Sequence, residues 1–132
     1  MQVNDAKLRE FAQRYTAAWC SRNPAAVAEF FSPSGSLKVN NAGPAVGRHA
    51  ITQVALSFMT AFPDLRVVMD DLRMSNGRVQ YHWTLTGTYS NANQVRVSGF
   101  EEWQLGEDGL IAVSEGHFDA EDYERQVADR VP

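Results

Sequence analysis

Hydrophobic residues recur every three or four positions in the first half of the chain, and every second position in most of the second half. The first spacing is typical of helices with one buried face, and the second of half-buried strands. Asn23 and Pro24 suit the cap and the first position of a helix, and Pro63 ends another. We therefore expect helices at about residues 4–21, 24–31 and 48–61.

The alternating half of the chain is interrupted by short polar segments that suit hairpin turns. We expect these turns at residues 75–77, 90–93 and 106–109, and another turn at 32–35. The predicted strands cover about residues 36–40, 65–74, 79–89, 95–105 and 110–118, followed by a closing helix at about 120–131. Helices followed by consecutive hairpins indicate an α+β fold, with the helices on one face of an antiparallel sheet. Because no repeat or linker divides the sequence, residues 1–132 are expected to form a single domain.

Composition excludes several classes of protein. With 44% hydrophobic residues among 132, the chain can bury a core without disulfides or metals. The net charge of −4 and the scattered basic residues provide no surface for a phosphate backbone, so we expect no nucleic-acid partner. The sequence has no apolar stretch of 18 residues and no secretory leader, so no membrane association is expected. Its one cysteine, Cys20, cannot form an internal disulfide, which predicts a reducing, cytoplasmic location.

Three short motifs carry a resemblance to a known family. They are Phe62-Pro63-Asp64-Leu65, Trp83-Thr84-Leu85-Thr86-Gly87-Thr88, and the Asp108-Gly109 turn before the last strand. Together with the order of elements, they resemble the SnoaL-like branch of the nuclear-transport-factor-2-like, or ketosteroid-isomerase-like, superfamily. The resemblance implies a cone-shaped, curved antiparallel sheet closed by three N-terminal helices, a pocket inside the cone, and a homodimer. Members that resemble this chain include polyketide cyclases, isomerases, epoxide hydrolases and dehydratases, so the fold leaves the reaction open.

The sequence departs from the polyketide cyclases at one important position. In those enzymes the last strand ends on an aspartate that is the catalytic acid/base. An ungapped match from Asp108-Gly109 places that aspartate on Gly116, which has no proton to transfer. The cyclase activity is therefore not carried over to this chain.

Glu101 is the best candidate for acid/base chemistry. A four-residue turn at 106–109 would pair Glu101 with Ser114 and place Glu101 and Trp103 on the same face as position 116. Since the resemblance puts that position in the pocket, both side chains are expected to point into the cone. Burial among apolar residues would then raise the pKa of Glu101 into a range useful for a general base.

His82 has two possible placements. If residues 90–93 form a four-residue turn, His82 lies opposite Glu101, and the two could act together as a proton-transfer unit. A slip of one residue sends His82 to the outer face instead. Simple alternation also favours the outer face, because Val79, Tyr81 and Trp83 form the apolar set of that strand.

The remaining site residues are aromatic. More large aromatic residues are present than one small core needs, and some can line a cavity for a flat apolar or aromatic ligand. The residues expected to bind this ligand are Tyr15, Trp19, Phe58, Phe62 and Trp103. No metal is expected, because Glu115, His117 and Asp119 alternate on one strand without a second group of ligands. No cofactor is expected either, since the glycines match no phosphate-binding or dinucleotide motif.

The sequence thus favours a protein with a pocket for a small hydrophobic molecule. One hypothesis is a cofactor-independent acid/base enzyme of the isomerase, cyclase, dehydratase or hydrolase type, with Glu101 and His82 as catalytic residues. The alternative is a non-catalytic ligand-binding or dimerisation domain on the same scaffold, which would suit the glycine at position 116.

Overall fold

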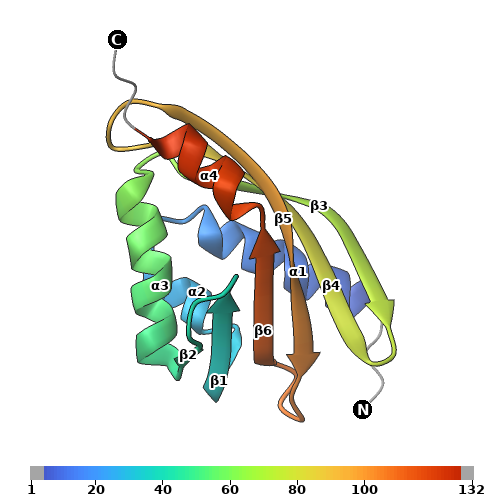
Figure 1. Cartoon of the computed structure of the whole chain (residues 1–132). Helices are drawn as coiled ribbons and strands as arrows, with labels where there is room; N and C mark the ends of the chain where they lie inside the picture. The colour runs from blue at the N-terminus through green and yellow to red at the C-terminus, as the bar shows by residue number, and fades with distance from the viewer. Residues whose placement is uncertain (1–4, 129–132) are drawn as a thin grey trace.

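The computed structural model describes residues 5–128 and has two layers, a curved six-stranded sheet and a group of helices packed on one of its faces (Figure 1). The strands lie side by side in the order β2-β1-β6-β5-β4-β3. The helices are α1 (Asp5–Trp19), α2 (Pro24–Ala28), α3 (Arg48–Ala61) and α4 (Ala120–Val127). The strands are β1 (Phe31–Val39), β2 (Ala45–Val46), β3 (Arg66–Ser75), β4 (Arg78–Thr88), β5 (Gln94–Leu105) and β6 (Ile111–Phe118).

The predicted α+β class, with a curved sheet and three N-terminal helices, is confirmed. All neighbouring strands are antiparallel except β1 and β6, which run parallel. This parallel pair joins the first strand of the chain to the last, so the sheet is mixed where the sequence predicted hairpins alone. The predicted helical residue 4 and residues 129–131 lie outside the described residues.

The turn predicted at residues 32–35 is wrong, because this segment belongs to β1. The strand begins at Phe31, and its pairing with β6 is irregular between Phe31 and Ser36. A Cβ atom at Gly35 would lie 2.8 Å from the carbonyl oxygen of Ile111, so glycine allows β1 to approach β6 closely here. The Ser-Pro-Ser-Gly sequence therefore marks an irregular strand where it had predicted a turn.

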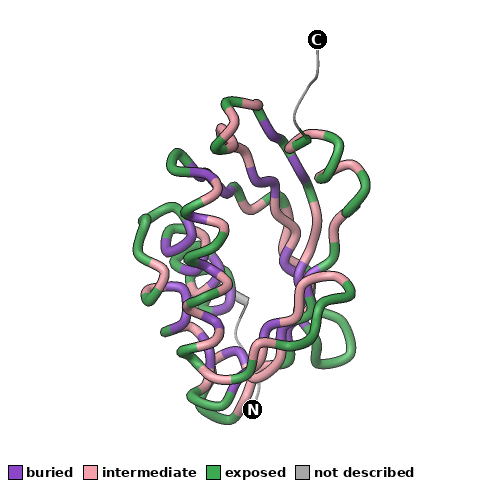
Figure 2. The backbone as a smooth tube through the Cα atoms, turned by 60° about the vertical axis from the view of Figure 1, so that its left-hand side comes forward, coloured by how far each residue is buried: buried purple, intermediate pink, exposed green. Residues whose placement is uncertain are grey.

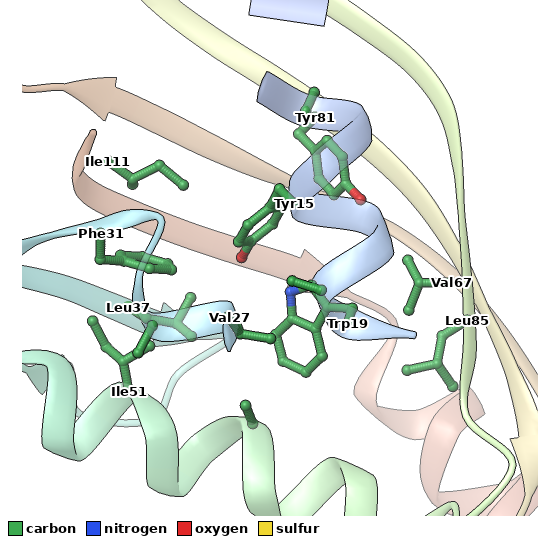
Figure 3. Packing of buried hydrophobic residues seen from close by; sticks show 14 of the residues in the cluster. Tyr15, Trp19, Val27, Phe31, Leu37, Ile51, Val67, Tyr81, Leu85 and Ile111 are labelled. Carbon is green, nitrogen blue, oxygen red and sulfur yellow. The ribbon is translucent and has the colours of Figure 1, made fainter. Parts of the chain in front are cut away.

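Buried residues occur in both layers (Figure 2) and meet in an aromatic cluster. Tyr15 of α1 is fully buried at the centre of this cluster, with its ring 5.2 Å from that of Trp103 and 5.4 Å from that of Tyr81, measured between centroids. Figure 3 shows Tyr15 and Trp19 projecting from α1 into the interior, with Tyr81 of β4 beside Tyr15. The cluster joins the first helix to the middle of the sheet.

Two of the family-like motifs meet in space and have a structural role. The carboxylate of Asp64 accepts hydrogen bonds from the backbone N–H of Thr88 (2.7 Å) and from its hydroxyl (2.8 Å). These bonds hold the pKa of Asp64 below its usual range. A Cβ atom at Gly87 would lie 3.1 Å from the Phe62 side chain, so glycine leaves room for that ring. The two motifs tie the end of α3 to the end of β4.

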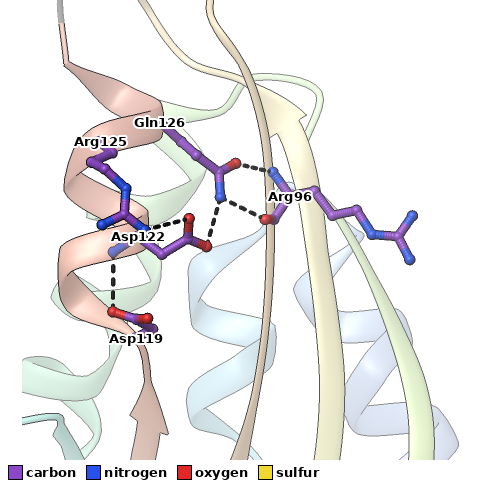
Figure 4. Close-up of polar contacts among 5 residues, drawn as sticks. All are labelled: Arg96, Asp119, Asp122, Arg125 and Gln126. Atoms are coloured by element: carbon purple, nitrogen blue, oxygen red, sulfur yellow. Dashed lines mark hydrogen bonds and ion pairs between the residues drawn. The ribbon is translucent and has the colours of Figure 1, made fainter.

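Helix α4 is held on β5 by polar contacts (Figure 4). The side-chain amide of Gln126 accepts a hydrogen bond from the backbone N–H of Arg96 (2.7 Å) and donates one to its carbonyl oxygen (2.9 Å), as a neighbouring strand would. Asp119 caps the helix by accepting a hydrogen bond from the N–H of Asp122. These contacts place α4 against the sheet although none of its residues is fully buried.

Candidate functional site

The register of β5 and β6 puts Glu101 directly opposite Gly116. The predicted pairing of Glu101 with Ser114 is therefore wrong by two residues. The connection is one residue longer than predicted, so that Leu105 pairs with Ile111, and the ladder shifts by one more residue between Gln104 and Leu105. A shift of two residues keeps each side chain on its face. Glu101 and Trp103 consequently point toward the helices, as predicted.

The register of β4 and β5 differs from the predicted one by a single residue. Thr88 pairs with Gln94, so the connection has five residues, and His82 pairs with Phe100. The His82–Glu101 pair does not form, since a one-residue shift moves His82 to the outer face of the sheet. Its ring stacks there on Phe100 with a centroid distance of 5.4 Å. The alternative based on simple alternation is the one that the structure shows.

A cavity of about 70 Å³, measured as room for the centre of a water-sized sphere, lies between the helices and the sheet. One water molecule needs about 10–15 Å³ on this scale, so the space suits a small organic molecule. The wall is almost entirely apolar, and Glu101 is its one acidic residue. The lining residues are Trp19, Leu37, Val39, Val54, Phe58, Val67, Tyr81, Trp83, Leu85, Val97, Glu101, Gly116, Phe118 and Tyr123.

Three donors converge on the Glu101 carboxyl group. Oε1 accepts hydrogen bonds from the Ser114 hydroxyl (2.7 Å), the Tyr15 hydroxyl (2.9 Å) and the Trp103 indole N–H (3.1 Å). Oε2 has only a longer contact, 3.2 Å, with the Tyr15 hydroxyl. Among the described groups, the second oxygen therefore keeps capacity to exchange a proton or to bind another group.

Burial raises the pKa of Glu101, because a carboxylate loses the solvation of water in this apolar wall. The hydrogen bonds from Ser114, Trp103 and Tyr15 oppose this effect by stabilising the charged form. Burial also raises the pKa of Tyr15, and the nearby carboxylate adds to the rise. The pKa of Glu101 is thus higher than that of an ordinary glutamate, while Tyr15 keeps its proton and acts as a donor.

The five aromatic residues expected to bind a ligand are divided between the cavity wall and the core behind it. Trp19 and Phe58 line the cavity, with ring centroids 6.1 Å apart. Tyr15, Phe62 and Trp103 are fully buried and are not among the lining residues. Tyr15 and Trp103 instead hold Glu101 in position from behind.

Sequence reasoning missed most of the sheet side of the cavity. Tyr81, Trp83 and Leu85 of β4 line it, and their two-residue spacing is the signal that simple alternation already contained. Tyr123 of α4 also lines it, although that helix is short and polar. No local pattern predicts Tyr123, because its position depends on how α4 docks on β5.

Two of the three residues with metal-like spacing, His117 and Asp119, have structural roles. Asp119 caps α4, and His117 packs against Phe100 with a centroid distance of 5.0 Å on the outer face. Within residues 5–128, no three His, Cys, Asp or Glu side chains gather as metal ligands. No helix in that same range has the length and apolarity needed to cross a membrane.

The SnoaL-like domain family matches residues 12–114, which is most of the chain and includes Glu101. The chain belongs to the SnoaL-like family. A comparison with curated proteins gives no match.

Solved structures share the fold of this SnoaL-like protein. TsrD from Streptomyces laurentii superposes with a TM-score of 0.82 at 17% identity, covering 96% of this chain and 98% of that one. A protein with a ketosteroid isomerase-like fold from Catenulispora acidiphila, solved with trimethylamine, has a TM-score of 0.81 at 15% identity, covering 89% and 92%. The epoxide hydrolase/cyclase-like enzyme SalBIII, with a role in pyran ring formation in salinomycin, has a TM-score of 0.78 at 17% identity, covering 90% and 95%. At these identities the likeness establishes the fold alone.

Proposed function

We propose that this SnoaL-like protein is a cofactor-independent acid/base enzyme that binds a small hydrophobic molecule and moves a proton on it with Glu101. The observation that carries the proposal is a single carboxyl group with a raised pKa in the wall of an apolar cavity. A general base works best when its pKa lies near the working pH, and burial raises the pKa of Glu101 toward that range. Isomerisation, cyclisation, dehydration and hydrolysis all include such a proton transfer.

The surrounding residues support this role by holding the carboxyl group in one orientation. The three donors bind mainly Oε1, which leaves Oε2 as the oxygen that takes and returns the proton. In an isomerisation, Glu101 would remove a proton from one atom of the ligand and deliver it to another, so that no further reactant is needed. Gly116, opposite Glu101, also lines the cavity and places no side chain beside the glutamate.

A ligand-binding domain without catalysis is the second candidate, and the same hydrogen bonds favour it. A carboxylate that accepts three hydrogen bonds can also be a purely structural group joining α1, β5 and β6. The two candidates differ in one property: an enzyme needs the titrating proton of Glu101, whereas a binding domain needs only the shape of its side chain.

The test is proton exchange on a probe that does not have to be the natural substrate. The protein is incubated in D₂O with 2-tetralone, a flat apolar ketone, and loss of the α-proton signals is followed by NMR. We expect the wild type to accelerate exchange above buffer, and Glu101→Gln to lose about 10²–10⁴-fold of that acceleration. The amide keeps the size of the side chain but cannot act as the base.

His82→Gln is the matched control, because His82 lies on the outer face and should leave exchange within about twofold of wild type. Circular dichroism of each variant shows that it is folded. Equal exchange by wild type and Glu101→Gln, or no acceleration by the wild type, would remove the proposed enzyme. A wild type that binds the ketone without accelerating exchange, and whose ketone affinity is unchanged in Glu101→Gln, would favour the binding domain.

We also propose that the protein is a homodimer that pairs through the outer face of the sheet. This face carries the neighbouring rings of His82, Phe100 and His117 together with Val68, half of whose surface is exposed. Apolar and aromatic groups gathered on one face suit an interface between copies. Sedimentation should give twice the mass of one chain at micromolar concentration, and Phe100→Glu should give a folded monomer. A wild-type monomer under these conditions would contradict the proposal.

A further inference from the structure

We infer that the ligand of this cavity carries a neutral oxygen that accepts a hydrogen bond from the indole N–H of Trp83. This inference extends the proposed binding of a small hydrophobic molecule by naming the polar group that the molecule must have. It assigns Trp83 as a residue that determines specificity. Ketones, ethers and epoxides with an apolar ring system meet the requirement, and plain hydrocarbons do not.

Trp83 belongs to the cavity wall and faces the helices with Tyr81 and Leu85. Its strand partner is Gly99, and a Cβ atom there would lie only 2.8 Å from Cζ2 of the indole. Glycine at position 99 therefore makes room for the indole ring to lie across the sheet. The ring packs edge to face against Phe118, with a centroid distance of 5.9 Å.

The indole nitrogen of Trp83 is buried and has no hydrogen-bond partner among the described protein groups. It is the one buried side-chain nitrogen or oxygen in residues 5–128 of which this is true. Two neighbouring groups are paired by contrast: the indole N–H of Trp103 donates to Glu101, and the hydroxyl groups of Tyr81 and Thr16 bond each other. A buried donor without an acceptor is costly, so its presence in a cavity wall points to an acceptor on the ligand.

The charge of the acceptor follows from the rest of the wall. Glu101 is the one acidic residue that lines the cavity, and no Lys or Arg lines it. A carboxylate or phosphate ligand would lie near Glu101 without a cation to offset its charge, and burial of such a group is strongly unfavourable. A neutral oxygen avoids this cost and still satisfies the Trp83 N–H. The largely apolar wall thus offers one carboxyl group and the unpaired indole N–H of Trp83.

The experiment compares 1-tetralone with tetralin, which has the same ring system without the oxygen. The indole nitrogens of the three tryptophans are labelled with ¹⁵N, and the Trp83 signal is assigned by its loss in Trp83→Phe. Trp19 lines the cavity and reports occupancy by either compound. We expect the ketone, and not the hydrocarbon, to shift the Trp83 indole proton downfield, and to bind about tenfold more tightly.

Replacement of Trp83 by 3-benzothienylalanine keeps the ring but puts sulfur in place of the N–H group. We expect this variant to bind both compounds with equal affinity, within about twofold. A ketone preference that persists in the variant would assign the oxygen to a protonated Glu101 and overturn the inference. It is equally overturned if both compounds shift the Trp83 proton alike, or if neither shifts the Trp19 signal at millimolar concentration. Proton exchange by wild type and Glu101→Gln is measured separately, so failure of catalysis does not affect this result.

Discussion

Ser114→Ala should raise the pKa of Glu101, and this change isolates one hydrogen bond of the site. Ser114 is fully buried in β6, and its hydroxyl donates the shortest hydrogen bond to the Glu101 carboxyl, 2.7 Å. It is also the strongest of the groups that lower the pKa of Glu101 against the effect of burial. Alanine removes only the hydroxyl, so the strand and its packing should be retained.

The size of the shift follows from the charge on the acceptor. A hydrogen bond to a charged group contributes about 1.5–3 kcal/mol, and most of that is lost when the acceptor is neutral. Since one pKa unit corresponds to about 1.4 kcal/mol, the pKa of Glu101 should rise by about 1–2 units in Ser114→Ala. The stability of the protein should depend on pH for the same reason. The Glu101 carboxyl has a higher pKa in the folded protein than in the unfolded one, so the free energy of unfolding falls as pH rises from the unfolded pKa to the folded pKa. In Ser114→Ala the folded pKa is higher still, so this fall should continue to higher pH.

The assay is a pH titration of the protein labelled with ¹³C at the Glu side-chain carboxyl carbons. The Glu101 signal is identified by its absence in Glu101→Gln. Ser98→Ala is the control, because the Ser98 hydroxyl bonds Thr84 on the opposite face of the sheet and should leave the pKa of Glu101 unchanged. An unchanged or lowered pKa of Glu101 in Ser114→Ala would refute the hydrogen-bond argument.

Four further changes test the site and the fold around it. Gly99→Ala should destabilise the protein by about 1–3 kcal/mol in urea unfolding, because the added Cβ collides with the backbone of β6 and with the indole above it. Gly116→Ala should cost less, since its Cβ would make only ordinary contacts of 3.5–3.7 Å, and an equal loss in both variants would contradict this reasoning. Asp64→Ala should lower the melting temperature at pH 7 by removing the bonds from Thr88; the difference should shrink as pH falls through the lowered pKa of Asp64, and a difference independent of pH would argue against it. Glu101→Gln should flatten the decline of stability with rising pH that is expected of the wild type, and an undiminished decline would show that another group causes it.

The loop between β4 and β5 shows why the position of His82 could not be predicted. The sequence indicates a turn there, but the register depends on its length. Asn91 donates to the carbonyl oxygen of Val127, and Asn93 to those of Gln126 and Ala128, so contact with the end of α4 accompanies the five-residue form. A local pattern contains no information about a helix more than 30 residues away, and one residue of length decides which face His82 occupies.

By itself, the sequence determined the fold class, the family resemblance, the ends of most elements and the face on which Glu101 lies. These follow from hydrophobic spacings of two and of three to four residues, which report directly which side chains are buried. The predicted face of Glu101 was right although its predicted strand partner was wrong, because a register shift of two residues keeps a side chain on the same face. Only the tertiary structure brought Tyr15 to Glu101, 86 residues away in the chain, and left the Trp83 indole N–H without a partner among residues 5–128. Such contacts depend on strand registers and helix docking, which are set by the packing of distant segments and not by any local pattern.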